Sequence, residues 1–182
     1  MTDIIGIAGS LRKGSYNAAL LRAAVEFVPD GHRLEIESIA GIPLYNYDLE
    51  ADGIPEPVAR LKDRIATADG LLIVTPEYNN AIPGVAKNAV DWLTRPPGDI
   101  SRVFRGKPVA VMGASPGRFG TVMAQAAWLP VLRTLRTRPW FGGRLQVSSA
   151  NEMFDEEGRL VDEKIRDLLR EFVSGFFEFA AR

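Results

Sequence analysis

The stretch GSLRKGSYN, residues 9–17, constrains the fold of this chain more than any other. It follows an apolar run at residues 4–8 and precedes a helical pattern at residues 18–25, so we expect a buried strand, a polar glycine-rich turn and then a helix. The backbone N–H groups of such a turn lie at the positive end of the helix dipole and can bind an anion. The sequence therefore predicts a phosphate site in this turn.

Four side chains of the turn are suited to an anion. Ser10, Ser15 and Asn17 can donate hydrogen bonds, and Arg12 supplies a positive charge and a planar fork that matches phosphate oxygens. Ser15 or Asn17 would also serve as the cap of an ordinary helix. Because capping and phosphate binding use the same backbone N–H groups, the two interpretations remain open together.

Two other phosphate-binding patterns fit the turn less well. Gly9 and Gly14 have the spacing of a P-loop, but Ser15 and Tyr16 stand where that loop needs Lys and Ser or Thr. The glycines also miss the GxGxxG spacing of a dinucleotide fold. A dinucleotide site remains a weaker alternative, with Glu35 or Glu37 of the next predicted strand on a ribose hydroxyl.

The composition narrows the possible partners and compartments. The 182 residues suffice for one domain, 1–182, and the 22 basic and 23 acidic residues favour neither nucleic acid nor an anionic membrane as a partner. The chain has no cysteine and one histidine, His32, so we expect no metal site, no disulfide and no cysteine nucleophile. No apolar run approaches ~18 residues, and no basic region precedes the first one, so we expect a cytoplasmic protein.

Periodicity predicts alternating strands and helices along the chain. Apolar or alternating runs predict strands over residues 4–8, 32–39, 70–75, 108–114 and 142–149. Helical spacing predicts helices over residues 18–25, 57–68, 84–93, 121–135 and 162–180. A kink or break is expected at Pro130. This alternation predicts an α/β fold with a doubly wound parallel sheet.

Polar loops follow three of the predicted strands, at residues 9–17, 76–83 and 115–120. Ligands of doubly wound sheets bind outside the carboxyl ends of the strands, so we expect these loops to converge on one site. A long irregular segment, residues 40–56, contains Tyr45 and Tyr47. It would serve as part of a substrate pocket, as a partner contact or as packing over the sheet edge.

Three motifs in these loops make the chain resemble the NAD(P)H-dependent FMN reductase family, which has a flavodoxin-like fold. They are GSLRKGSYN, PEYN at residues 76–79 and GASPG at residues 113–117. The resemblance covers nearly the whole chain. It implies a three-layer fold with a five-stranded parallel sheet of order 2-1-3-4-5, and FMN as a non-covalent cofactor.

The resemblance also implies a role for each loop. The FMN phosphate would be bound by Ser10, Arg12, Ser15, Tyr16 and Asn17. The isoalloxazine ring would be lined by Pro76, Glu77, Tyr78 and Asn79. The ring or the ribitol would be contacted by Ser115 and Gly117. Two structural alternatives remain, in which Tyr78 only packs and Glu77 stabilises the N-terminus of the helix after Pro83.

The implied activity is that of an oxidoreductase in which the flavin carries the chemistry, so no catalytic side chain is assigned. A hydride would pass from NADPH or NADH to flavin N5, and then to a small-molecule acceptor such as a quinone, a flavin, an azo compound or a metal ion. This alternation predicts ping-pong kinetics. Members of the family are typically oligomers, which implies a homodimer or homotetramer.

Two other functions fit parts of the sequence. The first is a flavodoxin-type electron carrier without its own NAD(P)H oxidation, but carriers usually have a strongly acidic surface and this chain has a net charge of -1. The second is a hydrolase, since GASPG fits the G-x-S-x-G elbow with Ser115 as nucleophile. His32 precedes that serine, however, and Pro116 has no N–H to give an oxyanion hole.

Overall fold

The computed structural model describes all residues, 1–182. Its sheet has the order β2-β1-β3-β4-β5, with β6 also paired to β4, and every pairing is parallel. The strands are β1 (Asp3–Ala8), β2 (Arg33–Glu37), β3 (Gly70–Val74), β4 (Pro108–Ala114), β5 (Arg138–Pro139) and β6 (Gln146–Val147). The predicted flavodoxin-like strand order is therefore confirmed.

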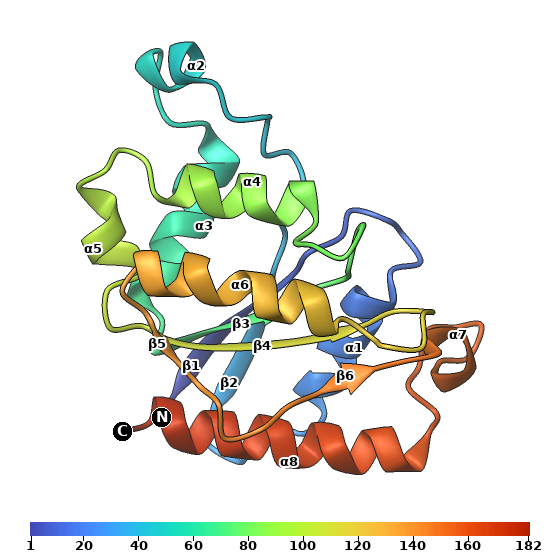
Figure 1. Ribbon diagram of the computed structural model, residues 1–182. Helices are drawn as coiled ribbons and strands as arrows, with labels where there is room; N and C mark the ends of the chain where they lie inside the picture. The colour runs from blue at the N-terminus through green and yellow to red at the C-terminus, as the bar shows by residue number, and fades with distance from the viewer.

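Helices cover both faces of the sheet, which gives the predicted three layers (Figure 1). On one face lie α1 (Tyr16–Val25) and α8 (Glu163–Ala180), and on the other lie α3 (Glu56–Thr67), α4 (Gly84–Leu93) and α6 (Val122–Thr134). Each face has its own buried apolar cluster. None of these helices combines the length and the apolar character that crossing a bilayer requires.

In the strands, apolar residues are mostly buried and polar residues are more exposed, with one exception in the edge strand β2. All residues of β3 are buried, as a central strand covered on both faces requires. In the edge strand β2, Ile36 is exposed whereas Glu37 is buried, the reverse of what their polarity suggests. Glu37 forms ion pairs with Arg60 and Arg64 of α3, which compensate for its burial.

Of the last predicted strand, over residues 142–149, only β6 forms, and the short strand β5 before it was not predicted. Between them the chain turns away from β4 toward α8 (Figure 1). The cause is tertiary packing: the Trp140 ring stacks edge-on against Phe172 of α8, with 4.9 Å between ring centroids. A continuous strand would lose this contact.

Helix α6 runs through Pro130, so the predicted break there is wrong. Trp128 and Leu132 are buried on either side of the proline and continue one apolar face across it. Three short helices were not predicted: α2 (Tyr47–Ala51), α5 (Asp99–Val103) and α7 (Ala150–Met153). Each has only one turn or so, too little for a periodic signal.

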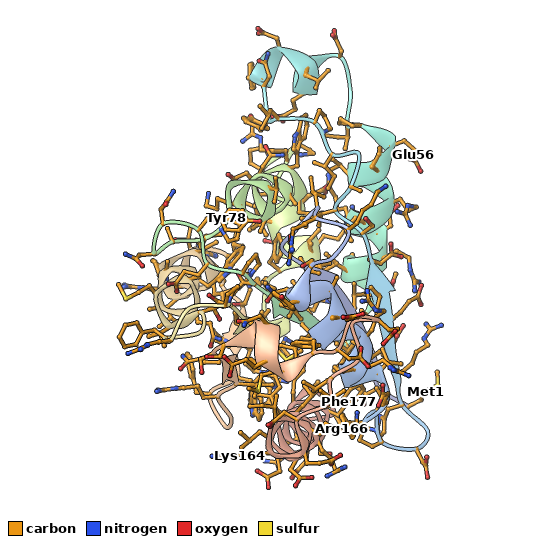
Figure 2. The ribbon with its side chains drawn as sticks, turned by 90° about the vertical axis from the view of Figure 1, so that its right-hand side faces the viewer. Met1, Glu56, Tyr78, Lys164, Arg166 and Phe177 are labelled. Carbon is orange, nitrogen blue, oxygen red and sulfur yellow. The ribbon has the colours of Figure 1, made fainter.

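The irregular segment around α2 projects from the body of the molecule in both views (Figure 1, Figure 2). We call residues 42–54 the arm. Glu50 of α2 ties the arm to the body, because it accepts hydrogen bonds from the Tyr45 hydroxyl at 2.8 Å and from Arg95 Nε at 2.7 Å. Tyr45 in turn packs edge-on against Trp92 of α4.

Candidate functional site

The loops after β1, β3 and β4 converge at the carboxyl edge of the sheet around a cleft of about 380 Å³. The cleft is lined by Ser10, Arg12, Ser15, Tyr16, Asn17, Pro76, Glu77, Tyr78, Ala114, Ser115 and Pro116. Nine of the predicted site residues are in this lining, and the other two, Asn79 and Gly117, lie next to it in the chain. Ala114 and Pro116 also line the cleft but were not predicted as site residues. Their place in the GASPG motif, where β4 passes into the third loop, could have indicated them.

The turn between β1 and α1 leaves a run of backbone donors free. Ser15 caps α1, because its Oγ accepts from the Ala18 N–H at 3.3 Å, and its own N–H donates to the Arg12 carbonyl. The backbone N–H groups without a partner in the chain are those of Ser10, Leu11, Lys13, Gly14, Tyr16 and Asn17. Unpaired N–H groups at the positive end of a helix form an anion site.

Arg12 adds an unneutralised positive charge to this turn. Its side chain is exposed and forms no ion pair with any acidic residue of the chain. The guanidinium lies 5.2 Å from the centroid of the Tyr16 ring, and that ring packs against Phe154. The stacking orients Arg12 and leaves its N–H groups available for an anion.

Asn17 connects the first loop to the third. Its side chain is buried, 3% exposed, and its amide makes two hydrogen bonds with the backbone of Ala114. Nδ2 donates to the Ala114 carbonyl at 2.8 Å, and Oδ1 accepts from the Ala114 N–H at 2.9 Å. Only one N–H of the amide remains free for a ligand. The side chain of Asn17 therefore mainly holds the first and third loops together.

The second loop is a tight hairpin over residues 76–81. Tyr78 and Ala81 exchange two backbone hydrogen bonds, of 3.2 and 3.0 Å. The residues between them, Asn79 and Asn80, have φ values of 51° and 61°. This is the pattern of a two-residue type I′ turn, in which asparagine is favoured. Tyr78 is therefore presented on a rigid tip, where 48% of it is exposed (Figure 2).

Glu77 ties this hairpin to a helix. Its Oε2 accepts from the backbone N–H of Ala124, in the first turn of α6, at 2.9 Å. A carboxylate at this position is favourable because the first N–H groups of a helix lack intrahelical partners. The structural alternative predicted that Glu77 stabilises the helix after Pro83, which is α4. In the structure Glu77 instead bonds to the N-terminus of α6.

Close packing between the loops depends on two glycines. A Cβ at Gly9 would lie 3.1 Å from Ala86 Cβ and 3.2 Å from Pro76 Cδ. A Cβ at Gly113 would lie 2.1 Å from the carbonyl oxygen of Thr75. Gly113 therefore cannot carry a side chain, and a side chain at Gly9 would press on Ala86 and Pro76 where the loops meet.

The geometry excludes the hydrolase alternative. Ser115 follows β4 at the carboxyl edge, whereas His32 precedes β2 and lies at the opposite end of the parallel sheet. His32 Nδ1 accepts from the Thr2 N–H at 3.0 Å, and its ring packs against Phe177, far from Tyr78 (Figure 2). Ser115 Oγ accepts from the Gly117 N–H at 3.0 Å and has no imidazole to activate it.

A parallel sheet of this order, with an anion-binding turn after β1 and two more loops at the switch point, defines the flavodoxin-like class of flavin-binding proteins. The comparison with protein families is more specific. The chain belongs to the NADPH-dependent FMN reductase family, whose model matches residues 2–152.

Characterised relatives are similar over nearly their whole length. The NAD(P)H-dependent FMN reductase PA1204 of Pseudomonas aeruginosa is 48% identical over 168 residues, which cover 92% of this chain and 89% of that protein. The 2-hydroxy-1,4-benzoquinone reductase of Burkholderia sp. is 38% identical over 176 residues, 93% of this chain and 91% of that protein.

A solved structure of a flavoenzyme is also similar to this chain. FerB of Paracoccus denitrificans, a flavoenzyme NAD(P)H:(acceptor) oxidoreductase, superimposes with a TM-score of 0.88 at 37% identity, over 100% of this chain and 98% of that one. This chain is therefore an oxidoreductase that uses FMN and NAD(P)H, and the electron-carrier alternative is set aside.

Proposed function

We propose that residues 1–182 work as one flavodoxin-like domain in the cytoplasm that binds the FMN phosphate in the turn after β1. The ring lies between the hairpin at residues 76–81 and the loop at residues 114–117. Electrons pass from NADPH or NADH to a small-molecule acceptor such as a quinone, a flavin, an azo compound or a metal ion. The observation that carries this proposal is the run of unpaired N–H groups beside the unpaired Arg12.

Each group of the cleft has a defined task in this proposal. The free N–H groups, Ser10 Oγ and the Arg12 guanidinium bind the phosphate, as charge-assisted hydrogen bonds favour. Tyr78 on the hairpin and Ser115 on the opposite loop orient the ring. FMN, when bound, supplies the hydride chemistry. Glu77, an acid lining the cleft, is bonded to α6, so no side chain is needed as a general acid or base.

The test of the phosphate site is the affinity for FMN of two variants. Arg12→Ala removes the cation over Tyr16 and is expected to raise the Kd for FMN about tenfold, the value of one charge-assisted hydrogen bond. Lys13→Ala is the matched control, because it removes an equally exposed cation from the same turn. Equal effects of the two substitutions on the Kd would contradict the assignment of Arg12.

The open cleft supports a ping-pong mechanism. Tyr78 at its rim is half exposed, so nicotinamide donor and electron acceptor reach one site in turn. The expected result is a set of parallel double-reciprocal lines when the acceptor concentration is varied at several concentrations of NADPH or NADH. Intersecting lines would show that donor and acceptor are bound together.

We also propose that the protein is a homodimer or homotetramer that associates through the arm. Leu44 and Tyr47 are 81% and 66% exposed on this projecting segment, although Glu50 bonds the same segment to Arg95. Large apolar side chains on a rigid projection are typical of contact surfaces. Light scattering should show a smaller assembly for Leu44→Ser/Tyr47→Ser than for the unchanged protein. An unchanged mass would show that the arm is not the interface.

A further inference from the structure

The outer edge of the sheet beside β4 has a gap. β5 pairs with β4 at residues 108–109, and β6 pairs with it at residues 113–114. Between these pairings the chain descends toward α8 and leaves the middle of β4 uncovered (Figure 1). We call this gap the notch.

The notch leaves the backbone of one residue unpaired. Alternate residues of a parallel strand face opposite neighbours, and on the outer edge Val109 accepts from the Trp140 N–H while Gly113 donates to the Leu145 carbonyl. Val111 lies between them and faces the same way. Extension of β5 would bond the Val111 N–H to the Trp140 carbonyl, and extension of β6 would bond the Val111 carbonyl to the Leu145 N–H, but neither bond is present.

Specific residues keep the notch open. Trp140 points to the α8 side of the sheet and packs against Phe172 and Phe176. A Cβ at Gly142 or Gly143 would lie 2.5 or 2.7 Å from the Trp140 ring. The chain can therefore wrap this ring only with glycines, and that wrapping holds residues 141–144 away from Val111.

A cavity of about 270 Å³ lies between the notch and α6. Its apolar lining consists of Val109, Val111, Val122, Ala126, Leu129, Leu132, Pro139, Trp140 and Phe141. Gln125, Arg144 and Gln146 supply its polar groups. No residue is shared with the lining of the cleft at the carboxyl edge, so the two sites are separate.

We propose that the notch binds a flat bicyclic heteroaromatic molecule whose adjacent donor and acceptor pair with the carbonyl and N–H of Val111. The apolar walls favour burial of a ring system, and a cavity of about 270 Å³ has room for one. An unpaired N–H and carbonyl among apolar side chains are relieved by a ligand that bonds both. A lactam or an aminopyridine edge has this arrangement of donor and acceptor.

A peptide strand fits the notch less well. Strand addition uses the backbone groups of several alternate residues along an edge, whereas here only Val111 is free between the pairings of β5 and β6. The length of the gap therefore favours a small molecule with one donor–acceptor pair.

The probe for this site is 2-quinolone, a bicyclic lactam, with N-methyl-2-quinolone as the matched control that lacks the donor. The FMN-loaded protein carries labelled Val and Leu methyl groups, and NMR follows them during titration. We expect 2-quinolone to shift the methyl signals of Val109, Val111, Leu129 and Leu132. The N-methyl compound should bind about tenfold more weakly because it cannot donate to the Val111 carbonyl.

A variant that fills the cavity completes the test. Ala126→Leu adds bulk to the wall formed by α6 and should abolish the shifts, whereas Arg133→Leu, exposed on the same helix outside the cavity, should preserve them. Three results would overturn the proposal. They are equal affinity for the two quinolones, binding unchanged by Ala126→Leu, and the absence of any shift at these methyl groups at millimolar 2-quinolone.

Discussion

At the scale of single residues, the sequence predicted which side chains lie around the cleft but not which groups they form hydrogen bonds with. Asn17 was predicted to bind phosphate, yet most of its amide is committed to Ala114, 97 residues away in the chain. Glu77 was placed beside the wrong helix for the same reason. A motif shows residue types and spacing along one loop, whereas these partners come from other loops and depend on how the strands are ordered in the sheet.

Glu77 gives the prediction at this scale. Glu77→Ala removes the acceptor for the Ala124 N–H and should lower the free energy of unfolding by about 1 kcal/mol, as loss of a helix cap does. Hydrogen exchange at residues 122–124 should accelerate in the apoprotein. Glu77→Gln keeps an acceptor oxygen and should restore most of the protection. If the Gln variant exchanges as fast as the Ala variant, charge rather than the hydrogen bond fixes the hairpin.

At the scale of elements, long periodic segments were predicted well. The bounds of α4 and β4 agree with the sequence patterns to the residue. The failures have one physical origin: a contact with a distant element overrides the local pattern. Trp140 packs on α8 and the last predicted strand shrinks to Gln146–Val147, whereas buried side chains on both sides of Pro130 keep α6 continuous. The short helix of the arm has too few residues to be predicted at all.

The arm gives a pH prediction. The hydrogen bond from Arg95 holds the pKa of the Glu50 carboxyl below its ordinary value. A lowered pKa in the folded state means that this contact stabilises the arm above the ordinary pKa of glutamate and is lost as the pH falls through the lowered value. Protection of residues 42–54 against hydrogen exchange, taken relative to the intrinsic exchange rate at each pH, should therefore decrease as the pH falls below the ordinary pKa of glutamate, about 4.3. In Glu50→Gln the exchange should already be fast at neutral pH and should lack this transition.

At the scale of the whole molecule, the parallel sheet and the meeting of the loops at one edge followed from the alternation of strands and helices. The strand order and the three layers were implied by the resemblance to the reductase family. The notch followed from neither, because it results from the packing of one indole against α8. General rules of topology thus predicted where the cleft lies. They contain no information about a gap in one edge of the sheet.

Cofactor binding should stabilise the molecule in a way that reports on the phosphate site. A ligand that binds only the folded state at a hundred times its Kd adds about 2.7 kcal/mol to the free energy of unfolding. FMN should therefore raise the Tm more than riboflavin, which lacks the phosphate, at equal concentration. Arg12→Ala should reduce the shift with FMN and leave the shift with riboflavin unchanged. Equal Tm shifts for FMN and riboflavin in the unchanged protein would show that the turn after β1 does not bind the phosphate.

The link between Asn17 and Ala114 has a consequence for how the chain reaches its native state. The two bonded residues are 97 positions apart, and β3, α3 and α4 lie between them in the sequence. A nascent chain that has only made β1 and α1 has the donors of the phosphate turn but not the strand that immobilises them. Productive capture of the cofactor therefore waits until β4 has joined the sheet, so that flavin loading reports late assembly during biosynthesis.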